Sequence, residues 1–282
     1  MNGPTALIYG VLIPAAVAGI VLMLCGRGSG EVRPARAFIG ALAFGVGWLI
    51  AYRFIVGMPD LPGSTVQIAP HAWLAWFVLA AIALAPLRDI ESLRRWSNPF
   101  YAILFSIISF RFPLANVLEN DVSGIAIRFG LTLVMYMAWN ASDSLATRVR
   151  GPALPAAWMI SGVGVALCSL FAHVALFAQL AGALTAALGA AAVVGLIDRG
   201  TRFADGAIAI MWLVFAGALI NAGIYDLSRV SIALLVVAML APWVVTRKSF
   251  AGRPLVAAGV AMLAAALPTA IAVWIAYEPT PY

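Results

Sequence analysis

Residues 156–197 read AAWMISGVGVALCSLFAHVALFAQLAGALTAALGAAAVVGLI, and none of these 42 residues is Asp, Glu, Lys or Arg. As one continuous helix, this stretch would be about 63 Å long. The hydrocarbon core of a bilayer is only about 30 Å thick. The stretch is therefore predicted to cross the membrane twice, as a helical hairpin whose turn lies near Gln179.

The composition of the whole chain resembles that of this stretch. Of the 282 residues, 64% are hydrophobic and 10% are charged, and the mean hydropathy is +1.02. A soluble globular domain is about half apolar and about a quarter charged. The composition therefore excludes a soluble enzyme, a disordered tail and a nucleic-acid-binding domain, and it makes the lipid bilayer the partner of the chain.

Apolar runs bounded by charged residues, proline and glycine predict ten transmembrane helices. The alternating pattern of a membrane β-barrel is absent from the sequence. We therefore predict an all-α, polytopic membrane bundle that forms one integral domain over residues 1–282. The first span is expected to be uncleaved, because no positively charged region precedes it. The ten spans are roughly 5–25, 37–57, 70–87, 99–117, 124–143, 156–176, 179–197, 206–225, 230–246 and 255–277.

The basic residues predict the orientation of the bundle. If alternate connections are cytoplasmic, beginning after the first span, thirteen of the 17 basic residues lie on the cytoplasmic side. Because cytoplasmic loops are enriched in Lys and Arg, both termini are predicted on the non-cytoplasmic side of a cell (inner) membrane. Aromatic residues near the ends of the spans are interpreted as interfacial anchors. They are Trp96, Trp158 and Trp243 near predicted inner ends, and Trp73, Tyr225, Trp274 and Tyr277 near predicted outer ends. The thirteen residues are Arg27, Arg33, Arg36, Arg88, Arg94, Arg95, Arg148, Arg150, Arg199, Arg202, Arg247, Lys248 and Arg253.

The seventh predicted span has small residues at steps of three or four, namely Gly182, Ala186, Gly189 and Ala192. Small residues allow the backbones of neighbouring transmembrane helices to approach closely. Ordinary packing within the bundle is the favoured interpretation. The alternative is that another membrane subunit docks on this face.

Two features concern the shape and the origin of the bundle. Pro113, Pro242 and Pro268 interrupt predicted spans and are expected to kink them. Leu84-Ala85-Pro86 and Leu240-Ala241-Pro242 occupy similar places near the ends of the third and ninth spans. This short match suggests a weak internal repeat of spans 1–4 and 7–10.

Three arginines, Arg53, Arg111 and Arg128, lie within the outer parts of predicted spans. Isolated charges are costly in hydrocarbon, so such residues are candidates for function. The functional interpretation is a water-accessible outer vestibule that binds an anion. The alternative is that the arginines snorkel or form structural salt bridges. The expected ion-pair partners are Asp60, Glu119, Asp121 and Asp226, and His173 and Asn221 are expected at the same level as further substrate-binding residues.

The sequence contains no recognisable catalytic or metal-ligating motif. Cys25 and Cys168 are expected to be free thiols, and no metal or cofactor is expected. Asp143, at the inner end of the fifth span, is expected to cap the helix or face the cytoplasm. A hydrolase site within the membrane is disfavoured because no suitable group of residues lies at one depth.

These observations support two functions almost equally. The first is a transporter or permease for a small solute, with an anion favoured by the outer arginines. The second is a non-catalytic structural or accessory subunit of a larger membrane complex. An enzyme that modifies lipids or transfers glycans, with Glu119 or Asp121 as its base, is the third and least favoured hypothesis.

Overall fold

The computed structural model describes residues 5, 7–26, 36–59, 70–90, 92–93, 96, 99–100, 122–199, 204–247, 250 and 253–277. Every regular element in this part of the chain is helical. One short element, η1, is a π-helix, and η2 and η3 are 3₁₀-helices. In chain order the elements are η1 (Ile8–Leu12), α2 (Ile13–Gly26), α3 (Arg36–Ile55), α4 (Pro70–Leu84), η2 (Ala85–Asp89), α6 (Val122–Arg148), α7 (Ala153–Phe171), α8 (Ala175–Ile197), α9 (Ala204–Tyr225), α10 (Arg229–Leu240), η3 (Ala241–Thr246) and α11 (Pro254–Tyr277).

Within the described residues, eight helical stretches are long and apolar enough to cross a membrane. They correspond to predicted spans one to three and six to ten, and they confirm an all-helical, polytopic membrane protein. The fifth predicted span lies in α6, which has 27 residues and is long enough to cross a bilayer. The fourth, 99–117, lies almost wholly outside the described residues, so the total of ten stays a prediction.

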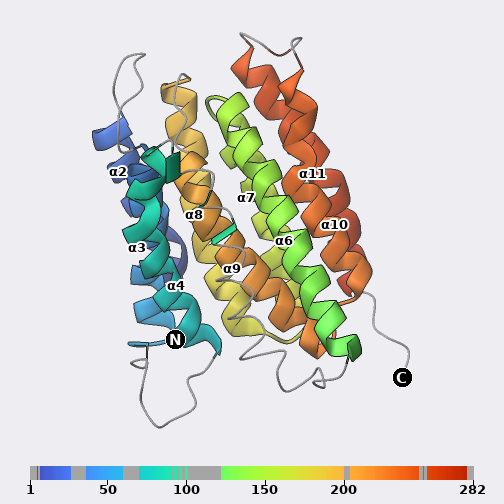
Figure 1. The fold of residues 1–282 in the computed structure, drawn as a ribbon. Helices are drawn as coiled ribbons and strands as arrows, with labels where there is room; N and C mark the ends of the chain where they lie inside the picture. Colours follow the sequence, from blue (N-terminus) through green and yellow to red (C-terminus); the bar gives the residue numbers. More distant parts are fainter. Residues whose placement is uncertain are drawn as a thin grey trace.

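The helices lie side by side along a common direction (Figure 1). α7 packs against α8 and α11, α2 packs against α3 and α8, and α3 packs against α9. α9 is the most enclosed, because its side chains from Ala207 to Phe215 are all buried. A helix that is apolar on all sides is typical of the centre of a bundle.

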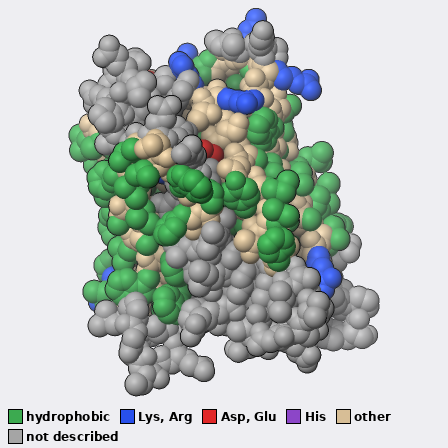
Figure 2. All heavy atoms as spheres, viewed as in Figure 1, with side chains coloured by type: hydrophobic (Ala, Val, Ile, Leu, Met, Phe, Trp, Pro, Cys, Tyr) green, Lys and Arg blue, Asp and Glu red, His purple; other side chains and the backbone are tan. Residues whose placement is uncertain are grey.

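Contacts between helix ends define the two ends of the molecule. At one end, which we call the basic end, the Arg148 guanidinium lies 5.3 Å from the centre of the Trp243 ring. At the opposite end, the rings of Tyr9 and Phe54 stack with centroids 3.9 Å apart. The described Lys and Arg side chains visible in Figure 2 lie mostly near the basic end, and hydrophobic side chains cover the middle.

The first and last described helices have their outer extremities at the same end. Tyr9 lies at the start of the chain's first helical segment, and the ring of Tyr277, at the end of α11, lies 5.4 Å from that of Phe171. In Figure 1, the start of the first described helical segment and the end of α11 both lie at the end opposite the basic end. The side of the membrane that this end faces stays a prediction.

Buried tryptophans join distant helices through hydrogen bonds to backbone carbonyls. The Nε1 of Trp48 donates to the carbonyl of Leu180 at 3.0 Å, and the Nε1 of Trp158 donates to the carbonyl of Met239 at 3.0 Å. Trp158 is fully buried, so its prediction as an interfacial anchor is wrong. It faces α10 because its indole N–H finds a buried acceptor there.

The two Leu-Ala-Pro segments adopt the same local conformation. Each leucine is the last residue of an α-helix, and each alanine begins a 3₁₀-helix. The backbone dihedral angles are φ −89°, ψ −10° at Leu84 and φ −92°, ψ −11° at Leu240. Proline explains the change, since it lacks the N–H that would continue the α-helix. The longer internal repeat of spans stays a prediction.

The three predicted proline kinks have different outcomes. Pro242 interrupts its span, because α10 gives way to η3 beside it. Pro268 lies inside α11, which runs as one helix to Tyr277. Pro113 lies outside the described residues.

Candidate functional site

The structure describes only part of the predicted outer vestibule. Arg53 lies in the last turn of α3, and Asp226 follows α9; both are exposed at the end opposite the basic end. No hydrogen bond or ion pair within the described residues joins them. Arg111, Asp60, Glu119 and Asp121 lie outside the described residues, as does the side chain of Arg128, whose backbone belongs to α6.

His173 lies in the tight turn between α7 and α8, where it has φ 60°. The turn has the hydrogen bonds of a Schellman motif: the N–H of His173 donates to the carbonyl of Leu170, and the N–H of Val174 donates to the carbonyl of Ser169. The hairpin predicted from the uncharged stretch therefore exists, but the turn predicted near Gln179 is wrong. Gln179 lies inside α8, because the chain reverses at the helix-capping turn rather than at the polar residue.

Asn221 is nearly buried in α9, and its Nδ2 donates to the carbonyl of Gly217 at 2.8 Å. This contact lies within one helix. It satisfies part of the amide without bringing Asn221 to Arg53 or His173.

The small residues of α8 that were predicted to form one packing face have different surroundings. A Cβ on Gly189 would lie 3.2 Å from the Sδ of Met159 on α7, whereas a Cβ on Gly182 would meet nothing within 4 Å. Ala186 lies between them and is half-buried. Gly189 therefore permits close packing of α7 on α8, and Gly182 faces open space.

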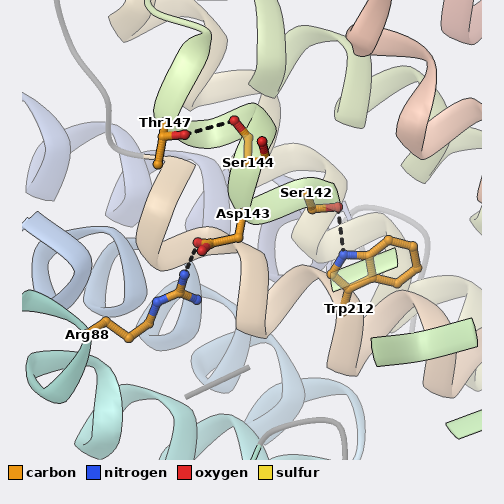
Figure 3. Close-up of polar contacts among 6 residues, drawn as sticks. All are labelled: Arg88, Ser142, Asp143, Ser144, Thr147 and Trp212. Carbon is orange, nitrogen blue, oxygen red and sulfur yellow. Dashed lines mark hydrogen bonds and ion pairs between the residues drawn. The ribbon is translucent and has the colours of Figure 1, made fainter. Parts of the chain in front are cut away.

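A polar cluster at the basic end combines a charged pair with a buried hydroxyl group. Arg88, at the end of η2, forms an ion pair with Asp143 of α6 (Figure 3). The exposed fractions of these side chains are 3% and 16%. The 3₁₀-helix that follows Pro86 carries Arg88 to this position. The prediction that Asp143 caps its helix is wrong, because α6 continues to Arg148. That Asp143 faces the cytoplasm stays a prediction.

Neighbouring Ser142 makes the second contact of this cluster. Its Oγ accepts a hydrogen bond of 3.0 Å from the Nε1 of Trp212 on α9, and both residues are buried (Figure 3). Adjacent residues of a helix point about 100° apart. Ser142 and Asp143 therefore hold the same turn of α6 against two different elements, α9 and η2.

One nitrogen of the Arg88 guanidinium takes no part in the ion pair. Nη1 of Arg88 is buried and has no hydrogen-bond partner within the described residues. Breaking a buried pair by removing one partner leaves an uncompensated charge, which is strongly destabilising. The cluster therefore acts as a clamp on the part of α6 near the basic end. It has no set of groups arranged for acid–base chemistry.

No pattern in the sequence indicates that Arg88 and Asp143 form a pair. Arg88 and Asp143 are 55 positions apart, and each is one of several charged residues predicted near the basic end. Only the rotation of α6 about its axis decides which residue Asp143 meets. In the described part of the chain, no group of three or more His, Cys, Asp or Glu side chains is placed to hold a metal ion.

Comparison with known proteins yields one similarity. No curated protein and no solved structure matches the chain significantly. Residues 85–177 match a protein family described as lipopolysaccharide export system permease LptF/LptG. The matched segment is about one third of the chain, and it begins at η2 and ends early in α8. Both partners of the buried ion pair lie within this segment that is similar to the LptF/LptG permeases.

Proposed function

We propose that this protein is an inner-membrane permease component that handles a lipid-linked glycan of the lipopolysaccharide type. The observation that carries the proposal is the match of residues 85–177 to the LptF/LptG permeases. The polytopic helical architecture supports it, because the described chain is built almost entirely of helices suited to a bilayer. A substrate that is itself an amphiphile is consistent with a protein of this kind.

This proposal replaces the small solute that was predicted from the outer arginines. The argument from Arg53, Arg111 and Arg128 concerned an anion and did not depend on its size. An anionic glycolipid presents its charge at the membrane surface, where such side chains snorkel. The match therefore favours an amphiphile without removing the reason for expecting a negative charge on it.

The buried ion pair of Arg88 and Asp143 is consistent with this proposal. It lies inside the matched segment and ties α6 to η2, while Ser142 ties the same turn to α9. Permeases work by moving helices or bundles against one another. A helix held at one end by a buried pair is suited to transmit such a movement.

The test is depletion of the protein in cells of its host, followed by pulse-labelling of lipid-linked glycans. We expect the labelled glycan exposed on the cell surface to fall several-fold while the total amount made is unchanged. Plasmid-borne wild-type protein should restore the exposed fraction. If the glycan exposed on the surface is unchanged and the uptake of a small anion is lost instead, the permease for a small solute would be the better hypothesis.

The accessory-subunit hypothesis is tested separately. The matched family is described as part of an export system, so partners in the membrane are expected. Mild detergent extraction and size-exclusion chromatography, followed by mass spectrometry, should recover a partner in stoichiometric amount. Recovery of a monomer or homodimer alone would favour a permease that acts by itself.

A further inference from the structure

Two glycines hold the connection between α6 and α7 against the end of α8. Gly151 has φ 68°, a conformation that favours glycine, and a Cβ on it would lie 3.1 Å from the carbonyl oxygen of Arg199. A Cβ on Gly195 would lie 2.8 Å from the backbone nitrogen of Pro152. Any larger residue at these two positions would push the segments apart. The backbone at Gly151 is therefore held beside that of Arg199.

This contact brings two exposed arginines to one surface at the basic end. Arg148 is the last residue of α6, three positions before Gly151, and Arg199 follows the end of α8. Both side chains are exposed, and neither forms an ion pair with a residue that the structure describes. Arg150 is exposed in the same connection, and the neighbouring carboxylate, Asp198, is half-buried. The surface therefore has a net positive charge.

A tryptophan ring orients one of the two arginines. The Arg148 guanidinium lies 5.3 Å from the centre of the Trp243 ring, within the range of a cation–π interaction. A guanidinium that stacks by its face keeps its edge free, and the edge carries the paired N–H groups that match phosphate oxygens. Trp243 therefore presents Arg148 as an oriented donor.

Exposed apolar side chains lie on the membrane side of both arginines. Trp243 belongs to the membrane-crossing stretch of α10 and η3, and Leu196 and Ile197 end the stretch of α8. All three side chains are exposed. Arg148 contacts the first of them, and Arg199 lies two residues beyond Ile197. Cations beside an exposed apolar surface at a membrane boundary suit a molecule with an anionic head and acyl chains.

We propose that Arg148 and Arg199 bind the phosphate of an anionic glycerophospholipid in the leaflet at the basic end, and that Trp243 contacts the acyl region of this lipid. Basic pockets between transmembrane helices bind such headgroups. The enrichment of basic residues in cytoplasmic connections explains why arginines occur at this end. It does not explain why two of them, from different helices, meet beside exposed apolar side chains.

The lipid in this proposal is a component of the bilayer and not the cargo, so the inference does not rest on the proposed function. An acidic protein is the other anionic ligand that a basic surface attracts. Such a partner would bind from the aqueous side, where the exposed side chains of Trp243, Leu196 and Ile197 would contribute nothing. A phospholipid uses both the charged and the apolar parts of this surface.

The experiment uses the full chain in nanodiscs that contain phosphatidylcholine and phosphatidylglycerol in equal amounts. Native mass spectrometry counts the lipids that stay bound after release. We expect bound phosphatidylglycerol to exceed phosphatidylcholine by about fivefold, because the choline cation repels the guanidinium groups. The double variant Arg148→Gln, Arg199→Gln should abolish this preference. Trp243→Leu should lower it several-fold, because Arg148 loses the ring that orients it.

Arg229→Gln is the matched control, since it removes an exposed arginine at the opposite end, and it should keep the full preference. A second measurement separates a lipid from a soluble anion. In detergent, short-chain phosphatidylglycerol should raise the thermal unfolding temperature by several degrees, and inorganic phosphate at the same concentration should not. An equal lipid preference in the double variant and in Arg229→Gln, or equal stabilisation by inorganic phosphate, would overturn the proposal.

Discussion

His173 has the one positive φ angle among the described residues other than glycine. The left-handed conformation costs about 1–2 kcal/mol for a residue with a Cβ. Glycine is the usual residue at this position of a Schellman motif. A histidine there is explained by neither helix propensity nor any contact with the predicted vestibule residues that the structure describes.

We therefore predict that His173→Gly raises the free energy of unfolding by about 0.5–1 kcal/mol. The reason is relief of the strained φ angle. Chemical unfolding in detergent measures the change, and His173→Ala is the control that keeps the strain. A loss of stability in the glycine variant, with no such loss in the alanine variant, would contradict this view of the turn.

The buried ion pair belongs to the same scale. We predict that Asp143→Asn lowers the free energy of unfolding by about 3–5 kcal/mol, because the buried guanidinium of Arg88 loses its counter-charge. The double variant Arg88→Met, Asp143→Leu should recover most of this loss. Arg150→Ala, which changes an exposed arginine at the same end, is the matched control and should be nearly neutral. A full double-mutant cycle without coupling would show that the two side chains do not act as a pair.

At the scale of elements, the change from α-helix to 3₁₀-helix explains where a buried indole binds. In the 3₁₀ pattern, the carbonyl of Met239 would accept a hydrogen bond from residue 242, but Pro242 has no N–H. Trp158 of α7 supplies the missing donor. The proline break in one helix is thereby tied to the packing of another.

It follows that Trp158→Phe should lower the free energy of unfolding by about 1–3 kcal/mol, since a buried carbonyl loses its donor. Trp243→Phe provides the comparison, because that ring is partly exposed at the basic end and its loss should cost less. Thermal unfolding in detergent, followed by near-ultraviolet circular dichroism, measures both. Equal stability of the two variants would argue against the hydrogen bond as a fold determinant.

At the scale of the whole molecule, the distribution of basic residues predicts which end faces the cytoplasm. Arg150 is exposed in the connection between α6 and α7 at the basic end, and Asp226 is exposed in the connection between α9 and α10 at the opposite end. The bilayer separates them in this orientation.

The orientation is tested by single cysteines at these two positions in a chain carrying Cys25→Ser and Cys168→Ala. In inside-out vesicles, a membrane-impermeant maleimide should label Arg150→Cys and spare Asp226→Cys. The pattern should reverse in right-side-out vesicles. Labelling of both positions from one side would refute the predicted threading of the chain.

The residue sequence by itself determined the helical membrane architecture, the order of the spans and the clustering of basic residues at one end. Each of these is a sum over neighbouring residues, since burial in lipid depends on local hydropathy and length. The position of the turn at His173 was not predicted, because the turn depends on a left-handed backbone conformation that a histidine does not indicate. The small-residue steps in α8 were visible, but not which of them meets Met159 and which faces open space.

Only the tertiary structure decided the pairing of Arg88 with Asp143 and the bond from Trp158 to Met239. In both cases the partners come from different helices, 55 and 81 positions apart. Such contacts depend on the rotation and axial shift of packed helices, which hydropathy leaves undetermined. A transmembrane helix that is apolar on most of its surface carries little information about the face it turns to its neighbours, so packing has to supply it.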